Sequence, residues 1–273
     1  MTENIIPSSF IWRRLHSITG IWLALFIIFH LLTNSQAALP LGDDGIGFVR
    51  AVNSIHDLPY LHLIEIGILG VPILIHALWG IHYLYSASYN SFGKTGHTPY
   101  LPEYPRNRAY TWQRITAWIL VLGVIGHIVH MRFIEYPTPF GQEKHAYIVR
   151  VSLDDGIYSL TKRLDIQLET KHQGISLKRG EAVAVAKDFG TAELLMVRET
   201  FKMPIMLVLY TLFVLTACFH AFNGLWTAAI TWGIALTERA QRIIRYLTVL
   251  LMVSVASLGL CAIWLTYWIN LKG

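Results

Sequence analysis

Four histidines lie inside four different long apolar segments and are the residues best placed to do chemistry: His30, His76, His127 and His220. An ionisable ring in an apolar segment costs free energy unless something holds it. Neutral imidazole is a common ligand of haem iron, and two rings that face each other from neighbouring helices can bind one iron from both sides. Four such rings would therefore serve two haem b groups. The alternative is that each histidine only hydrogen-bonds a backbone carbonyl or lines a wet cavity.

The composition indicates which elements hold these histidines. Of the 273 residues, 54% are hydrophobic and 14% are charged, a balance too apolar for a soluble globular protein. Five apolar segments reach the ~20 residues that a bilayer-spanning helix needs. They cover about residues 11–34, 60–87, 111–133, 203–236 and 243–271. We therefore predict an all-α integral membrane protein with five transmembrane helices, the first four of which form a haem-binding four-helix bundle.

The cysteines and the basic residues narrow this prediction. Cys218 and Cys261 lack the Cys-x-x-Cys-His arrangement that attaches haem covalently, so any haem is held non-covalently. The net charge of +5 does not indicate nucleic acid, because the basic residues cluster in short connections rather than on one basic face. These residues are Arg13, Arg14, Lys94, Arg106, Arg108, Arg114, Arg239, Arg242 and Arg245. The positive-inside rule makes their connections cytoplasmic, which predicts a multi-pass protein of a bacterial cytoplasmic (inner) membrane with its N-terminus inside and its C-terminus outside.

The depths of the four histidines sort them into two pairs. At a rise of ~1.5 Å per residue, His30 and His127 lie about 6 Å and about 9 Å from the outer ends of their helices. His76 and His220 lie about 24 Å and about 26 Å from the outer ends of theirs. The result is an outer pair and an inner pair on the order of 15 to 20 Å apart, close enough for two stacked haems to exchange electrons. Such an arrangement conducts electrons from the cytoplasmic face toward the outer face.

Two further groups of residues have candidate roles around the haems. His130 lies one helical turn after His127 and is a rival for the outer ligand, although its position nearer the surface also fits an interfacial residue. Haem propionates need cationic and hydroxyl partners at a membrane edge, and Arg14, Ser17 and Arg114 could supply them. Simple anchoring of the helix ends by the arginines explains them equally well.

The segment 135–202 interrupts the membrane helices and has a different composition. Alternating runs at 147–151, 164–168 and 182–186, separated by turns at Asp155-Gly156 and Arg179-Gly180, predict short strands. We expect a small β-rich extracytoplasmic insert between helices three and four, acting as a cap or a partner contact. The chain then divides into helices one to three (1–134), the insert (135–202) and helices four and five (203–273), with the helices forming one membrane domain.

Several sequence motifs around the histidines resemble those of a known family. They are Arg13-Arg14-Leu15-His16-Ser17 with Gly20 and His30, Pro72 with His76-Ala77-Leu78-Trp79-Gly80, Gln113-Arg114 with His127 and Arg132, and Phe219-His220-Ala221-Phe222-Asn223-Gly224-Leu225-Trp226 followed by Thr231-Trp232-Gly233-Ile234 and Arg239-Ala240-Gln241-Arg242. The chain resembles the cytochrome b (b558-type) membrane anchor subunit of succinate dehydrogenase, or succinate:quinone oxidoreductase, of the five-helix, two-haem kind also found in some fumarate reductases. The resemblance covers the helices and departs from the family pattern in the insert.

The resemblance implies a specific role for the chain. The outer haem would be held by His30 with His127, chosen over His130 because Arg132 follows five residues later, and the inner haem by His76 with His220. A flavoprotein subunit would oxidise succinate, and an iron-sulfur subunit docked on the cytoplasmic face would pass the electrons to this chain. The chain would then reduce a membrane quinone, expected to be menaquinone, as part of the tricarboxylic acid cycle. The sequence itself holds no dinucleotide-binding glycine motif and no cysteine set for an iron-sulfur cluster.

Two other functions remain open from the residues alone. One is the di-haem cytochrome b subunit of another quinone-linked enzyme, such as a hydrogenase or a formate dehydrogenase, which different partner subunits would reveal. The other is a haemless membrane transporter whose histidines relay protons, which the absence of a haem absorption band would reveal. The sequence lacks the paired broken helices in two matching halves that are typical of many transporters.

Overall fold

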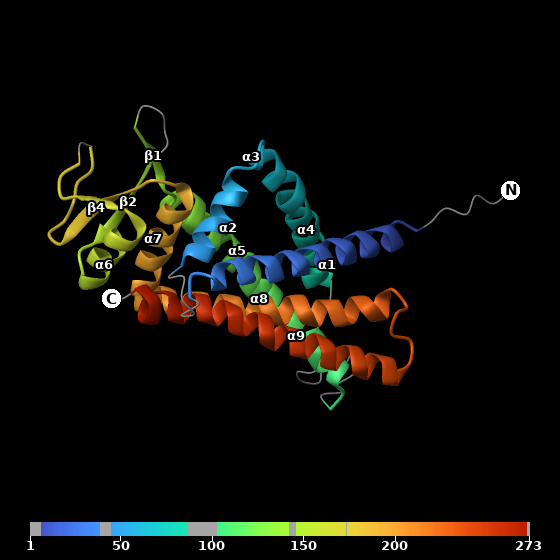
Figure 1. The fold of residues 1–273 in the computed structure, drawn as a ribbon. Coiled ribbons are helices and arrows are strands. Elements are labelled where there is room, and N and C mark those ends of the chain that lie inside the picture. Colours follow the sequence, from blue (N-terminus) through green and yellow to red (C-terminus); the bar gives the residue numbers. More distant parts are fainter. Residues whose placement is uncertain (1–6, 39–44, 87–102, 142–145, 173, 272–273) are drawn as a thin grey trace. The chain divides into compact units, whose positions relative to one another are not determined.

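A computed structural model of the chain describes residues 7–38, 45–86, 103–141, 146–172 and 174–271, and its fold is traced in Figure 1. Five helices in it are long and apolar enough to cross a membrane. These spans are Ser8–Ser35, Leu61–Tyr85, Pro105–Ile134, Pro204–Thr231 and Glu238–Trp268. The prediction of a multi-pass, mostly helical membrane protein is confirmed. Lys94 and the expected end of the second span at Ala87 lie outside the described residues.

Local sequence signals explain where several spans begin and end. Pro105 and Pro204 are the first residues of α5 (Pro105–Ile128) and α8 (Pro204–Thr231), a position that suits proline because its missing N–H would have no helical partner. The fourth span ends at Thr231, five residues earlier than expected, because Gly233 takes a left-handed φ of 74°. The backbone N–H of Gly233 then donates to the Ile230 carbonyl at 3.1 Å, which closes the helix.

Three of the spans contain a π-helical segment, which hydropathy alone does not predict. The second span consists of α3 (Leu61–Ile64), η1 (Glu65–Gly70) and α4 (Val71–Ser86). The third continues from α5 into η2 (Val129–Ile134), and the fifth continues from α9 (Glu238–Leu265) into η3 (Thr266–Leu271). Such wider turns occur often at functional sites, and η2 begins two residues after His127.

The insert contains the antiparallel sheet that the sequence predicts. Its strands are β1 (Thr138–Phe140), β2 (Ala146–Ser152), β3 (Gln167–Glu169) and β4 (Glu181–Ala186), in the order β1-β2-β4-β3. The predicted strands 147–151 and 182–186 are confirmed, and they pair with Tyr147 opposite Ala186. The turn at Arg179-Gly180 is also confirmed, with Gly180 at a φ of 85°.

Two helices of the insert were not expected from the strand pattern. The predicted tight turn at Asp155-Gly156 is wrong, because α6 (Asp155–Leu164) begins there and the Asp154 side chain caps it by accepting from the Ile157 N–H at 2.8 Å. The helix ends where Asp165 takes a left-handed φ of 55°. The strand predicted at 164–168 is therefore displaced to β3.

The second insert helix, α7 (Phe189–Lys202), packs against β2 and against α2 (Ile46–His56), which lies in the connection between the first two spans. Gly190 permits the close contact with α2, because a Cβ there would lie 2.5 Å from the Val49 carbonyl oxygen. Asn53 of α2 accepts from the Gly190 N–H at 2.7 Å and donates to Asp188 at 2.8 Å. Hydrogen bonds as well as apolar contacts therefore join the two helices.

A buried ion cluster links α6 and α7. The Arg198 side chain is fully buried and donates to Asp154 and, at 2.6 Å, to Glu199. Lys202 lies 2.7 Å from Asp154 and 3.2 Å from Glu199. Burial raises the pKa of Asp154, but the hydrogen bonds from Lys202 and Arg198 outweigh it, so the pKa lies below its usual range. Two carboxylates thus neutralise two cations, as burial of charge requires.

The chain forms two compact units, and each unit contains parts of several helices. Unit 1 comprises residues 1–29, 62–124 and 215–255, and unit 2 comprises 30–61, 125–214 and 256–273. The predicted division at residues 134 and 202 follows the order of the chain instead and remains a prediction.

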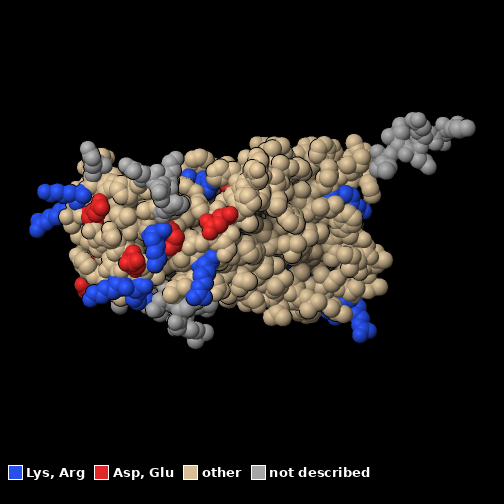
Figure 2. Space-filling model, turned by 45° about the horizontal axis from the view of Figure 1, so that its top comes forward, with Lys and Arg blue, Asp and Glu red and all other residues tan. Residues whose placement is uncertain are grey.

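Figure 2 shows that the Asp and Glu side chains visible on one face gather over the part formed by the insert, with many of the visible Lys and Arg.

Candidate haem-binding site

The inner pair of histidines comes together within unit 1. His76 lies on α4 and His220 on α8, and both rings are half-buried. Their ring centroids are 6.3 Å apart and their planes are inclined by 85°. The two side chains therefore face each other across a narrow gap between two membrane-spanning helices.

The outer pair comes together within unit 2 in a similar way. His30 lies on α1 (Ser8–Ser35) and His127 on α5. Their ring centroids are 6.0 Å apart and their planes are inclined by 79°. The two pairs are separate sites, each made by two different helices, and each repeats nearly the same ring geometry.

This spacing fits two imidazoles that bind one metal ion from opposite sides. A bond between a first-row metal ion and an imidazole nitrogen is about 2 Å long, so two bonds and half of each ring place the centroids about 6 Å apart. Among the described residues no cluster of three or more His, Cys, Asp or Glu is arranged to hold a metal ion. A haem does not require such a cluster, because the porphyrin supplies the other four nitrogen ligands.

The hydrogen bond at Nδ1 of His76 leaves its other nitrogen available. Nδ1 lies 3.1 Å from the backbone carbonyl oxygen of His16. A carbonyl oxygen only accepts, so Nδ1 carries the proton and donates it, and Nε2 keeps its lone pair. The ring of His16 also stacks on that of His76, with centroids 4.1 Å apart. The result is an oriented neutral ring in the tautomer that a metal ligand needs.

The same argument applies to His220 through a side-chain hydroxyl. The Thr116 hydroxyl donates to the Trp112 carbonyl at 2.7 Å, so it is an acceptor toward His220 Nδ1, which lies 3.2 Å away. His220 Nδ1 therefore donates, and Nε2 again keeps its lone pair. A second contact holds the helix backbone in place, since the Gln113 side chain donates to the His220 carbonyl at 3.0 Å.

The outer site has a tyrosine in the corresponding position. The Tyr210 hydroxyl lies 3.4 Å from His127 Nδ1 and 3.2 Å from His130 Nδ1. A hydroxyl can accept from one ring while donating to the other, so Tyr210 can accept from His127 and donate to His130. The ring centroid of His127 also lies 6.0 Å from that of His30. The geometry therefore favours His127 as the ligand and gives His130 a supporting position.

A glycine makes room for the inner pair. A Cβ at Gly20 of α1 would lie 2.8 Å from His76 Cε1, a separation that real Cβ atoms do not tolerate. The ring of His76 therefore lies directly against the backbone of α1. Any side chain at position 20 would displace the His76 ring from its position beside His220.

The structure places the three predicted propionate contacts in the first halves of α1 and α5, within unit 1. Arg14 donates to the Thr231 carbonyl at 2.7 Å and lies over the Trp232 ring, 4.7 Å from its centroid. Ser17 accepts from the Trp232 indole N–H at 2.9 Å, so Arg14 and Ser17 meet at one tryptophan. Arg114 lies on a different helix, is 7% exposed and donates to the Tyr110 hydroxyl at 2.9 Å. Their role toward propionates remains a prediction.

The residues that orient the rings were not found from the sequence. Thr116 and Tyr210 lie 104 and 83 residues from the histidines that they contact. Threonine and tyrosine are common in membrane helices, and neither their spacing nor their neighbours distinguish these two. The signal that would have found them is the rule that a metal-binding histidine needs a partner for its second nitrogen, applied once the facing helices are known.

Comparison with known proteins gives one informative match. The chain is 29% identical over 255 residues, 93% of this chain and 95% of the relative, to the succinate dehydrogenase cytochrome b558 subunit of Bacillus subtilis (strain 168). No family model and no solved structure matches the chain. The resemblance drawn from the sequence motifs is thus confirmed, and the chain is similar to this subunit over nearly its full length, including the insert region.

Proposed function

We propose that this chain, a relative of a succinate dehydrogenase cytochrome b558 subunit, is the di-haem cytochrome b membrane anchor of a succinate:quinone oxidoreductase. The observation that carries the proposal is that two separate pairs of histidine rings each have ring centroids close to 6 Å apart. Relatedness supports the enzyme class, and the ring geometry supports the number of haems. Neither depends on the other.

In this proposal the chain's own residues hold two haems and exclude water from them. His76 and His220 would hold the iron of the inner haem, and His30 with His127 that of the outer haem. When bound, the haems would carry single electrons between an iron-sulfur subunit and a membrane quinone, for which we propose menaquinone. The hydrogen bonds at Nδ1 of His76, His127 and His220 keep these rings in fixed orientations, which lowers the cost of binding.

The sequence lacks the motifs for a flavin and for an iron-sulfur cluster, which indicates the partner subunits that the chain would need. It contains two cysteines, which is too few for an iron-sulfur cluster, and no glycine-rich dinucleotide motif. Dicarboxylate chemistry would therefore belong to a flavoprotein subunit, and electron delivery to an iron-sulfur subunit on the cytoplasmic face. The basic connections support a cytoplasmic position for the N-terminal end of α1. The same residues would serve succinate oxidation and fumarate reduction.

The first experiment is to purify the chain from membranes with its copurifying subunits and measure haem per polypeptide by the pyridine haemochrome method. The expected result is two haem b per chain, a reduced-minus-oxidised b-type spectrum, and copurification of a flavoprotein and an iron-sulfur protein. Two haems with a nickel- or molybdenum-containing partner would instead indicate a hydrogenase or formate dehydrogenase subunit. A chain that binds no haem would overturn the proposal in favour of a transporter.

A further inference from the structure

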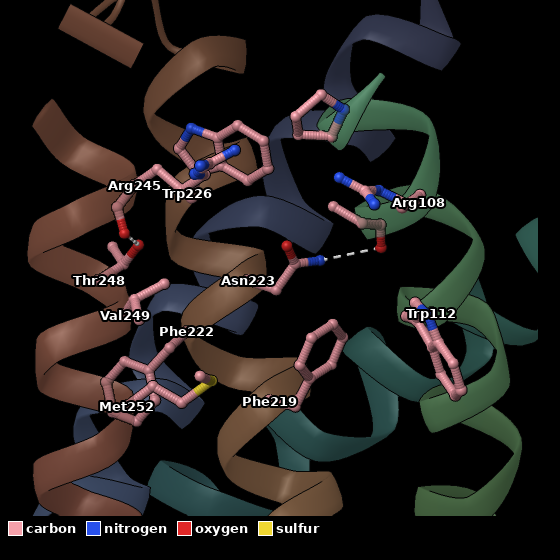
Figure 3. A pocket seen from close by; sticks show the side chains of 12 residues that line it. Arg108, Trp112, Phe219, Phe222, Asn223, Trp226, Arg245, Thr248, Val249 and Met252 are labelled. Carbon is pink, nitrogen blue, oxygen red and sulfur yellow. Dashed lines mark hydrogen bonds between the residues drawn. The ribbon is translucent and has the colours of Figure 1, made fainter. Parts of the chain in front are cut away.

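A cavity of about 420 Å³ lies in unit 1 between α5, α8 and α9, and none of the four paired histidines lines it. Figure 3 shows that its two ends differ in chemistry. The side chains of Arg108, Arg245 and Trp226 lie toward one end, and those of Phe219 and Met252 toward the other. A cavity with a cationic end and an apolar end fits an amphipathic ligand.

The two arginines at the cationic end are available to an anion. Within the part of the chain that the structure describes, neither Arg108 nor Arg245 forms an ion pair, and no carboxylate lines the cavity. The Arg245 guanidinium lies 6.0 Å from the centroid of the Trp226 ring and 5.9 Å from that of Tyr246. Such aromatic contacts orient a guanidinium without neutralising its charge.

Three other polar side chains of the cavity already have partners. The Asn223 amide donates to the Ala109 carbonyl at 3.2 Å and to the Gln113 side chain at 2.6 Å. The Thr248 hydroxyl donates to the Arg245 carbonyl at 3.1 Å, and the Trp226 indole to the Gln241 carbonyl at 3.1 Å. The guanidinium groups are therefore the cationic hydrogen-bond donors left for a ligand, and the indole N–H of Trp112 is a neutral one.

We propose that this cavity binds an anionic phospholipid of the cytoplasmic leaflet, with its phosphate between Arg108 and Arg245 and an acyl chain beside Phe219, Phe222 and Met252. Basic pockets between membrane helices on the cytoplasmic side bind anionic head groups in this way. The proposal rests on the membrane orientation given under Proposed function. A neutral quinone would not need two cations, and an acidic segment of a partner subunit would not need the apolar end.

The test is native mass spectrometry of the detergent-purified complex titrated with phosphatidylglycerol or phosphatidylcholine. The variant is Arg108→Gln with Arg245→Gln, and the matched control is Arg239→Gln with Arg242→Gln, which removes the same charge from the same group of cytoplasmic connections but not from the cavity. We expect phosphatidylglycerol affinity to fall about fivefold for either cavity substitution and about 30-fold for both. The control variant should bind as the wild type does.

Several results would overturn the proposal. Equal binding of phosphatidylcholine, or an equal loss of affinity in the control variant, would show that the two arginines do not select the lipid. Displacement of the lipid by inorganic phosphate at matched concentration, or by a short-tailed naphthoquinone, would indicate another ligand. Loss of the iron-sulfur subunit from the cavity variant alone would indicate a partner contact. Haem per polypeptide is measured on the same samples. Normal lipid binding with no haem would contradict the proposed function only, whereas two haems without selective lipid binding would contradict only the lipid site.

Discussion

At the scale of single residues, the histidines are held by hydrogen bonds that determine which nitrogen remains available. The His16 carbonyl and the Thr116 hydroxyl both accept from an Nδ1–H, so Nε2 is the nitrogen with a lone pair on both His76 and His220, whose ring centroids lie 6.3 Å apart. A lone histidine in an apolar helix has several explanations other than metal binding, such as a hydrogen bond to a backbone carbonyl or a place beside a wet cavity. Two facing rings with fixed tautomers have fewer, because each carries a lone pair that needs a partner in an apolar surrounding.

The hydroxyl of Thr116 provides a direct test of this arrangement. Thr116→Val keeps the shape of the side chain and removes the acceptor for His220 Nδ1. We expect haem affinity at the inner site to fall about 10-fold to 100-fold and the midpoint potential of that haem to rise, because an imidazole without this partner donates less charge to the iron. Haem retention and a redox titration measure both effects.

Thr227→Val is the matched control for that experiment. The Thr227 hydroxyl is on the exposed side of α8 and donates to the Gly224 carbonyl at 2.9 Å, so its loss should leave both haems unchanged. An equal shift in the two variants would show that the effect comes from the helix rather than from the hydrogen bond to His220.

The choice between His127 and His130 is a second test at this scale. His127→Ala should reduce the haem content from two per chain to one, because it removes the ring whose centroid lies 6.0 Å from that of His30. His130→Ala should keep both haems and change only the environment of the Tyr210 hydroxyl. Haem per polypeptide distinguishes them, and retention of two haems in His127→Ala would reverse the assignment.

At the scale of elements, the insert buries charges and carboxyl groups between its helices and the neighbouring segments, beside an apolar core that includes Ile157, Leu160 and Leu195. Arg198 is fully buried with Asp154 and Glu199 beside it. Removing one member of such a cluster leaves the others without a partner, which commonly costs about 3–5 kcal/mol. Helix α7 is therefore the central element of the insert, since it contacts the sheet, α2 and η3.

Glu193 on α7 gives the insert a predictable pH dependence. Burial raises the pKa of its carboxyl from 4.5 to about 8, an effect that the nearby Arg132 only partly offsets. Because the folded-state pKa lies above the unfolded value, the stabilisation from the protonated carboxyl is complete below pH 4.5 and is lost as the pH rises toward 8. The insert should therefore unfold more easily at pH 8 than at pH 5.

Glu193→Gln should remove this component of the pH dependence, because the amide stays neutral throughout. Limited proteolysis of the insert at pH 5 and pH 8, at matched protease activity, measures the difference between the variant and the wild type. Glu181→Gln is the control, since that carboxylate accepts from the exposed Lys178 backbone N–H at 2.9 Å. An unchanged pH response in Glu193→Gln would show that another group is responsible.

At the scale of the whole molecule, the orientation in the membrane decides what the two proposed haem sites could do. The basic connections predict that the N-terminus lies in the cytoplasm and the C-terminus outside. Electrons that enter at the inner pair would then move outward, and each charge that crosses changes the free energy by ~2.3 kcal/mol per 100 mV of membrane potential. The direction of the overall reaction would thus depend on the energised state of the membrane.

Reporter fusions test that orientation. Alkaline phosphatase, which is active only outside the cytoplasm, should be active when fused after Gly273 or inserted at the β-turn of Gly180. It should be inactive when fused within the connection after Thr231. Activity in the opposite pattern would place the histidine pairs in the reverse order across the membrane.

The sequence alone determined the class of the protein and most of its membrane helices. Long apolar runs can satisfy their backbone in a bilayer only as helices, so the five spans follow from hydropathy. The strands β2 and β4 follow from alternation of residue type. The start of α6 does not follow from the sequence pattern. Asp155-Gly156 favours a turn locally, and only the cap by Asp154 converts this turn into a helix.

The tertiary structure decided which side chains meet. Hydropathy gives the depth of a residue along its helix but not the rotation of that helix about its axis. The contacts of Thr116 with His220 and of Tyr210 with His127 depend on that rotation. Packing between helices sets it through close approaches such as the one at Gly20, where the ring of His76 lies against the backbone of α1. A sequence can therefore name the four histidines, whereas the proton and lone pair on each ring follow only from the neighbours that the fold provides.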